Sequence, residues 1–89
     1  MVARTHNLKT YPSDFEAVLS GKKTFEIRYN DRDFAEGDML VLEEWDPKTA
    51  AYTGRTVEKK VDYILKFDLD KYGQKQEVVE KGLYVIQIV

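Results

Sequence analysis

The sequence predicts a single α+β domain in which one short N-terminal helix accompanies a barrel or sandwich of about five strands. The chain has 89 residues, too few to supply two separate cores, so residues 1–89 are expected to form one domain. Hydrophobic residues make up 43% of the chain and aromatic residues 12%, which is enough apolar surface for a folded core. One segment has helical spacing, and several others alternate between apolar and polar residues or form short apolar runs.

A short strand and then a helix are expected at the N-terminus. Residues 4–10 are predicted to form a strand that ends before Pro12. Ser13 and Glu16 have the spacing of a capping box, in which the serine hydroxyl accepts a hydrogen bond from the first turn. The helix is therefore expected over residues 14–20, with Ser13 as its cap.

The expected helix carries one apolar stripe. Phe15, Val18 and Leu19 are spaced at i, i+3 and i+4, so they share one side, and we expect Phe15 and Leu19 to face the barrel. Gly21 can adopt the left-handed conformation that terminates a helix, which predicts an end near Ser20.

The next segment, residues 24–29, switches to the period of two that is typical of a strand. Successive side chains of a strand point to opposite faces, so this strand is expected to have one apolar and one polar face. The apolar face is formed by Phe25, Ile27 and Tyr29, and the polar face by Thr24, Glu26 and Arg28.

A β-hairpin is expected in the middle of the chain. Residues 39–42 form an apolar run short enough to begin a buried strand. Asp46 starts a turn and Gly54 closes it, so residues 40–45 and 55–65 are predicted to pair as the two arms of the hairpin.

Three further expectations concern the C-terminal half. The second arm of the hairpin is expected to bend or bulge between Lys59 and Val61, because the apolar parity is interrupted there. Residues 66–81 are polar and predict an excursion at the surface. Residues 83–89 are apolar on both faces except at Gln87, which predicts a central final strand.

Composition excludes several classes of function. The chain has no cysteine and one histidine, so we expect no disulfide, no thiol nucleophile and no metal cluster of cysteine or histidine ligands. We also predict no other metal site and no cofactor. Its net charge of -2 argues against electrostatic binding of long duplex nucleic acid. No run approaches the roughly 18 apolar residues that span a bilayer, and no signal core is seen, so a cytoplasmic protein without a membrane partner is expected.

Polar side chains concentrate in residues 21–28, where the helix is expected to end and a strand to begin. Arg28 offers a planar fork to a phosphate or a base edge, and Glu26 can accept from amino groups such as those of cytosine or guanine. Lys22 and Lys23 add positive charge for a phosphate. The alternative is that Glu26 and Arg28 only pair with each other and that both lysines are solvated.

The same segment resembles a known signature. Gly21-Lys22-Lys23-Thr24-x-Glu26-x-Arg28 is similar to the G-x-K-x-x-E-x-R pattern of ASCH domains, PUA-like barrels named after the activating signal cointegrator. Other stretches resemble small bacterial and phage members of that superfamily. These stretches are His6-x-Leu8-Lys9, Asn30-Asp31-Arg32-Asp33-Phe34, Gly37-Asp38 and Trp45-Asp46-Pro47.

The resemblance implies a PUA-like β-barrel of about five or six strands, with a cleft beside the signature that binds RNA or a nucleotide. We therefore expect a non-catalytic binding module for single-stranded RNA or a nucleotide-sized ligand, and we leave its oligomeric state open. A plain interaction domain with a structural signature is the other non-enzymatic reading. The expected ligand-binding residues are Lys22, Lys23, Thr24, Glu26, Arg28, His6 and Lys9.

An enzymatic alternative also follows from the resemblance. One branch of the superfamily hydrolyses the amide of N4-acetylcytidine with a signature lysine as base, which Lys23 matches. Glu26 occupies the position of the threonine nucleophile, and a carboxylate cannot replace a hydroxyl without changing the mechanism. An amidohydrolase would therefore need Thr24 instead, with Glu77 or Glu80 as the acid.

Two aromatic side chains are also candidates for contact with a base. Trp45 and Tyr29 have rings on which a base could stack. Such residues also serve as core or cross-strand contacts in a hairpin, so both interpretations stay open.

Overall fold

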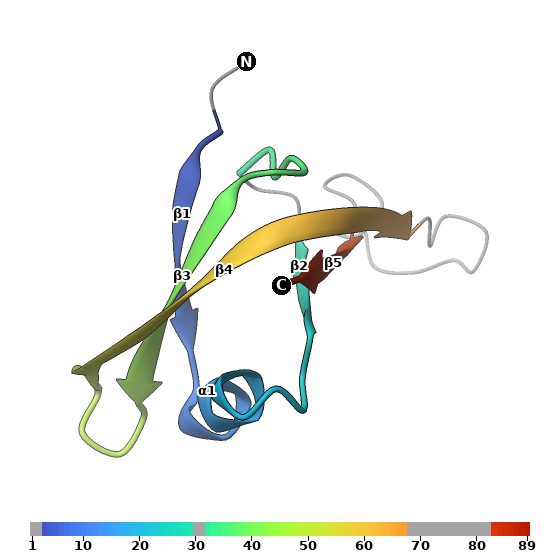
Figure 1. Cartoon of the computed structure of the whole chain (residues 1–89). Helices are drawn as coiled ribbons and strands as arrows, with labels where there is room; N and C mark the ends of the chain where they lie inside the picture. The colour runs from blue at the N-terminus through green and yellow to red at the C-terminus, as the bar shows by residue number, and fades with distance from the viewer. Residues whose placement is uncertain (1–2, 30–31, 68–82) are drawn as a thin grey trace, which may run out of the picture.

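The computed structural model describes residues 3–29, 32–67 and 83–89. Within these residues the domain consists of one helix and a five-stranded mixed sheet (Figure 1). This confirms the α+β class with one short N-terminal helix. The elements are β1 (Thr5–Thr10), α1 (Pro12–Leu19), β2 (Phe25–Tyr29), β3 (Met39–Asp46), β4 (Ala51–Phe67) and β5 (Leu83–Ile88).

The strands are ordered β1-β3-β4-β5-β2, with β1 parallel to β3 and every other pair antiparallel. The predicted central position of the last strand is confirmed, because β5 lies between β4 and β2. The helix leads from the end of β1 to the start of β2, so the two edge strands of the sheet are consecutive strands in the chain (Figure 1).

The long strand β4 joins the two halves of the sheet. Its first part pairs with β3 and its second part with β5, and it curves strongly between them (Figure 1). The predicted hairpin is confirmed, but its turn is shorter than expected, since pairing starts at Asp46 and Ala51. Gly54 lies within β4 with φ of 92°, beside a register shift between Glu43 and Trp45.

The predicted irregularity in β4 lies slightly later than expected. The last pair with β3 is formed by Lys60, and the register with β5 shifts between Val61 and Tyr63. An extra residue in one strand increases the local twist and bend, so this bulge marks the place where β4 passes from one half of the sheet to the other.

The sheet is not closed into a barrel, so this part of the sequence prediction is wrong for the described residues. The outer edge of β1 is bound by side chains instead of by a neighbouring strand. The guanidinium of Arg28 donates to the carbonyl of Lys9 at 3.1 Å, and that of Arg32 donates to the carbonyl of Asn7 at 2.8 Å. These bonds satisfy edge carbonyls that would accept from the backbone N–H groups of β2 in a closed barrel.

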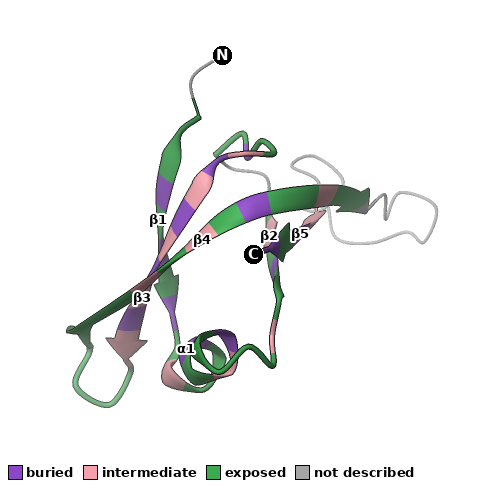
Figure 2. Cartoon of the chain, in the orientation of Figure 1, coloured by how far each residue is buried: buried purple, intermediate pink, exposed green. Residues whose placement is uncertain are grey.

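The core is formed jointly by the sheet and α1. Buried residues alternate with exposed ones in β1 and with partly buried ones in β3, as expected for strands with one face on the core (Figure 2). The helix contributes Val18 to the core cluster, and Phe15 is also buried. The buried apolar cluster comprises Leu8, Val18, Phe34, Leu40, Leu42, Val61, Ile86 and Ile88.

The helix differs from its prediction at its start and in its orientation. It begins at Pro12, whose fixed φ suits the first turn, and no side chain caps it, so the capping box with Ser13 is wrong. Leu19, expected to face the barrel, is 50% exposed, because Phe15 and Val18 take the buried side. The predicted termination at Gly21, with φ of 82°, is confirmed.

The alternation predicted for β2 is confirmed, with its polar side facing inward. Glu26 is buried and Arg28 is half-buried, whereas Phe25, Ile27 and Tyr29 are exposed. Glu26 is paired in register with Ile86 of the core, so the strand presents its polar row to the concave side of the sheet.

Most of the predicted surface excursion falls outside the described residues. Lys66 and Phe67 belong to β4, and the rest of the predicted surface excursion over residues 66–81 lies outside the described residues, as do Glu77 and Glu80. The described helix has eight residues, and no helix in the described ranges is long and apolar enough to cross a membrane.

Candidate functional site

A cleft of about 250 Å³ opens where the end of β1, the first turn of α1 and β2 come together. These elements meet because α1 connects the two edge strands, which do not pair with each other. Four lining residues, Lys9, Lys23, Glu26 and Arg28, were predicted as ligand-binding residues. The full lining is Lys9, Thr10, Tyr11, Asp14, Lys23, Glu26 and Arg28.

Glu26 is the most deeply buried charged group of the cleft, with a side chain only 4% exposed. Its Oε2 accepts a hydrogen bond from Nε of Arg28 at 3.2 Å. Its Oε1 is buried and accepts no hydrogen bond from the described residues, and the ammonium of Lys23 lies 3.7 Å away. A buried oxygen without a donor is unfavourable, so a donor that reaches Oε1 from the cleft would be stabilising.

Arg28 spans the cleft from β2 to β1. Its Nη2 lies 3.2 Å from Oε2 of Glu26 and donates to the carbonyl of Lys9 at 3.1 Å. Two anchors on opposite sides fix the plane of the guanidinium, and the bonds to described residues use Nε and Nη2. Nη1 is therefore the nitrogen that can donate to a ligand, in an orientation that is already set.

Lys23 connects the helix to the strand. Its ammonium lies 3.3 Å from Oδ1 of Asp14 and 3.7 Å from Oε1 of Glu26, and the lysine side chain is 20% exposed. The backbone N–H of Lys23 donates to the carbonyl of Ala17 at 2.9 Å, which holds the segment after α1 against the helix. The lysine charge is thereby placed between two carboxylates at the wall of the cleft.

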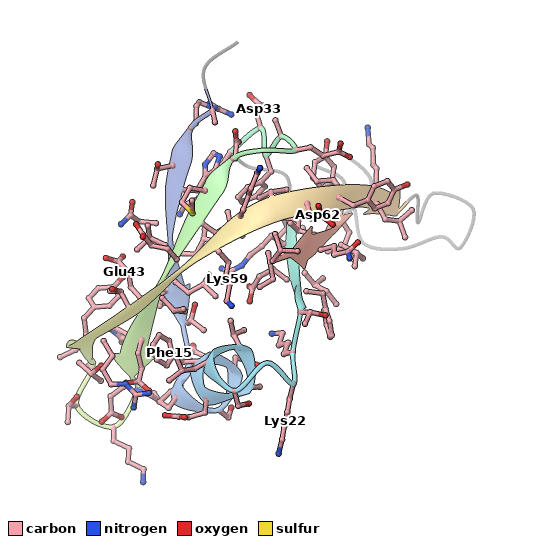
Figure 3. The ribbon with its side chains drawn as sticks, in the orientation of Figure 1. Phe15, Lys22, Asp33, Glu43, Lys59 and Asp62 are labelled. Carbon is pink, nitrogen blue, oxygen red and sulfur yellow. The ribbon has the colours of Figure 1, made fainter. Side chains whose placement is uncertain are left out.

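The remaining residues of the signature lie outside the lining of the cleft. Thr24 is exposed, and its carbonyl accepts from the N–H of Ile88 at 2.9 Å, just before β2 begins. Lys22 is exposed and its side chain points away from the body of the domain (Figure 3).

His6, the last predicted ligand-binding residue, is buried farther from the cleft near the start of β1. Its Nε2 lies 2.8 Å from Oδ2 of Asp38, and its ring lies 4.8 Å from that of Phe34. Asp38 also accepts from the N–H groups of Arg4 at 3.0 Å and Ala35 at 3.1 Å. The imidazole therefore fastens β1 to the turn before β3.

The stability of the domain should depend on the charge of Asp38. Burial raises the pKa of this carboxyl, but hydrogen bonds from Arg4, His6 and Ala35 outweigh burial and hold the pKa below its ordinary value of 3.8. The unfolded chain then binds a proton more readily, so the stabilisation is complete above about pH 4 and is lost as the pH falls through the lowered pKa. Asp38→Asn should cost about 1.5–3 kcal/mol at pH 7.

Urea denaturation of wild type and Asp38→Asn between pH 2.5 and 7 measures this effect. The difference between the two proteins should shrink toward acid pH. Asp62→Asn, which changes an exposed carboxylate of β4, is the matched control and should leave the free energy of unfolding within about 0.5 kcal/mol of wild type. A constant difference across the pH range would contradict the assignment to Asp38.

Three lining residues, Thr10, Tyr11 and Asp14, were not expected at the site. No local pattern marks them, because they reach the cleft through the packing of α1 between β1 and β2. Asp14 is nine residues from Lys23, and only the turn after α1 brings their charges to 3.3 Å. An acidic residue in the first turn of a helix interacts favourably with the helix dipole, so the position of Asp14 did not by itself indicate a site.

Comparisons with known proteins bear on the fold and on the family. The crystal structure of hypothetical protein PH0355 covers 96% of both chains with a TM-score of 0.66 and 18% identity, so the likeness concerns the fold alone. The uncharacterized 12.9 kDa protein in GpA 3'region of Escherichia phage P2 is 41% identical over 61 residues. That match covers 68% of this chain and 54% of the relative, so the chain spans about half the length of the phage protein.

The phage P2 protein confirms the predicted similarity to a phage protein, and the two comparisons name neither an ASCH or PUA-like domain nor an activity. A family model described as a domain of unknown function, DUF3850, matches residues 5–83, and this chain therefore belongs to the DUF3850 family.

Proposed function

We propose that this domain is an ASCH-type, PUA-like module that binds a nucleotide or a short single strand of RNA in the cleft, without catalysis. The observation that carries the proposal is Oε1 of Glu26, a buried carboxylate oxygen without a hydrogen bond from the described residues, at a cleft that Arg28 also lines. The similarity of residues 21–28 to the ASCH signature supports the same reading.

The hydrogen-bonding groups of the cleft suit the edge of a base that carries an amino group. Oε1 of Glu26 can accept from N4 of cytosine or from the amino group of guanine. Nη1 of Arg28 can donate to the ring nitrogen N3, which lies beside that amino group in both bases. Uracil presents a carbonyl oxygen where cytosine has its amino group, so a carboxylate would repel it.

The size and charge of the cleft favour a small ligand. Its volume of about 250 Å³ lies just below the roughly 300–1,000 Å³ of clefts that enclose drug-sized molecules. Its lining has three cationic side chains against two carboxylates, which gives a small local excess of positive charge in a chain whose net charge is -2. A mononucleotide or a short strand fits these conditions better than a long, salt-dependent RNA interface.

The test is a calorimetric titration of the protein with CMP, GMP and UMP. We expect CMP or GMP to bind about tenfold more tightly than UMP, since a good base contact discriminates by about 1–3 kcal/mol. Glu26→Gln should remove this preference, because its amide also offers a donor. Glu58→Gln, which changes an exposed glutamate of β4, is the matched control. Binding of none of the three nucleotides would refute the proposed function.

Hydrolysis of an N4-acylated cytidine is the alternative that the sequence raised. Thr24, its only signature hydroxyl, lies outside the lining of the cleft, which weighs against this reaction. We expect the protein to release no measurable acetate from N4-acetylcytidine. Turnover that Lys23→Ala abolishes and Glu26→Ala preserves would favour the hydrolase over the binding module.

A further inference from the structure

The side chains of Tyr11 and Trp45 lie next to each other beside the cleft, and we call this pair the ledge. Their ring centroids lie 5.9 Å apart with the planes tilted by 34°. Tyr11 is 50% exposed and also lines the cleft, and Trp45 is partly exposed on β3. The ledge is therefore continuous with the cleft, since the two share Tyr11.

Lys9 connects the cleft and the ledge. Its ammonium lies 4.4 Å from the centroid of the Trp45 ring, and the residue also lines the cleft. The carbonyl of Lys9 accepts from Arg28, so the backbone at this position is held against the cleft. The positive charge of an exposed residue thus lies between the place for a base and the aromatic rings.

A structural role explains only part of this arrangement. Trp45 is paired in register with Tyr52 across the β3–β4 hairpin, and cross-strand aromatic pairs stabilise hairpins. This pairing does not account for Tyr11, which precedes α1 and leaves half of its surface in solvent next to a polar cleft. Exposed rings beside a charged cleft are typical of sites where single-stranded bases stack.

We propose that the site takes at least two consecutive nucleotides of a single strand. One base occupies the cleft at Glu26, its neighbour stacks on the Tyr11–Trp45 ledge, and Lys9 neutralises the phosphodiester between them. This inference rests on the proposed function and extends it from a nucleotide to a strand. A contact between an exposed lysine and a ring is weaker than the stacking of a base, so the base displaces the ammonium toward the phosphate.

Trp45 is the only tryptophan of the chain, so its fluorescence reports on the ledge. The experiment titrates wild type with CMP and with the dinucleotide CpC, and with GMP and GpG in parallel. We expect the mononucleotide to bind with little change in tryptophan emission. The dinucleotide should quench the emission and bind about tenfold more tightly, because it adds one stacked base.

Substitutions distinguish the contribution of the ledge to binding from that of the cleft. By calorimetry, Trp45→Ala and Tyr11→Ala should each reduce the ratio of dinucleotide affinity to mononucleotide affinity toward one. Trp45 lies outside the lining of the cleft, so Trp45→Ala should also leave mononucleotide binding unchanged. Tyr11→Ala keeps the test valid if Trp45→Ala fails to fold, because Tyr11 is half exposed. Tyr63→Ala is the matched control, since Tyr63 is an aromatic residue of β4 that is 54% exposed and pairs with Gln87 of β5.

The outcomes distinguish this inference from the proposed function. Equal affinities for mononucleotide and dinucleotide would contradict stacking of a second base on the ledge. A dinucleotide advantage that persists in Tyr11→Ala would contradict it as well, and so would a dinucleotide that binds without quenching Trp45. None of these results would contradict binding of one base in the cleft. Failure of both ligands to bind would refute the proposed function and the ledge with it.

Discussion

Phe15→Ala is expected to destabilise the domain by about 3–5 kcal/mol, the range for removal of a large buried aromatic side chain. Phe15 is 1% exposed and lies on the side of α1 that faces β3 and β4 (Figure 3). The guanidinium of Arg55 lies 4.8 Å from the centroid of the Phe15 ring, so truncation also removes the surface on which this cation packs. Folded domains have only about 5–15 kcal/mol of stability, so this loss would be a large share of the total.

Urea denaturation followed by far-ultraviolet circular dichroism measures the loss. Leu19→Ala is the matched control in the same helix, because Leu19 is half exposed and its truncation should cost less than about 1 kcal/mol. The comparison also tests the orientation of α1. Equal destabilisation by the two substitutions would mean that Leu19 faces the core, as the apolar stripe in the sequence suggested.

The sequence predicted that Glu26 and Arg28 lie on one polar face, because side chains of a strand alternate with a period of two. Glu26 and Arg28 had to share a face wherever β2 was placed, and the structure has them in contact. Period alone does not say which face is buried. In this domain the pairing of β2 with β5 decides it, since Glu26 lies opposite Ile86 in the core-facing row.

The same rule explains why His6 and Lys9 do not meet at one site. They are three residues apart on β1, so they point to opposite faces of the sheet. His6 is directed inward and binds Asp38, whereas Lys9 lies on the outer face beside Trp45. The motif His6-x-Leu8-Lys9 does not reveal this separation, because it specifies positions in the chain and not the directions of the side chains.

Closure of the sheet could not be predicted from the elements. A barrel requires hydrogen bonds between the two edge strands, and these depend on the tilt and stagger of all five strands together. In this domain Arg28 and Arg32 take the edge carbonyls of β1. No periodicity in the sequence distinguishes an arginine that bridges two edges from one that is solvated.

Arg28→Ala is expected to weaken nucleotide binding by about 1–3 kcal/mol, or about 5- to 150-fold. The guanidinium is held by Glu26 on one side and by the carbonyl of Lys9 on the other, so it reaches the ligand without further loss of side-chain freedom. Its removal also leaves Oε2 of Glu26 without its hydrogen bond. Arg28→Lys should restore little of the affinity, because an ammonium cannot make both contacts in one plane.

Titration of CMP and GMP against wild type, Arg28→Ala and Lys22→Ala at two salt concentrations tests this role. Lys22 is the matched cationic control, since it belongs to the same signature but points away from the domain (Figure 3). Its removal should change affinity only slightly, and less at high salt, because an exposed charge acts over distance and is screened. If Lys22→Ala weakens binding as much as Arg28→Ala, the signature acts through its total charge, and the fixed guanidinium in the cleft is not the basis of recognition.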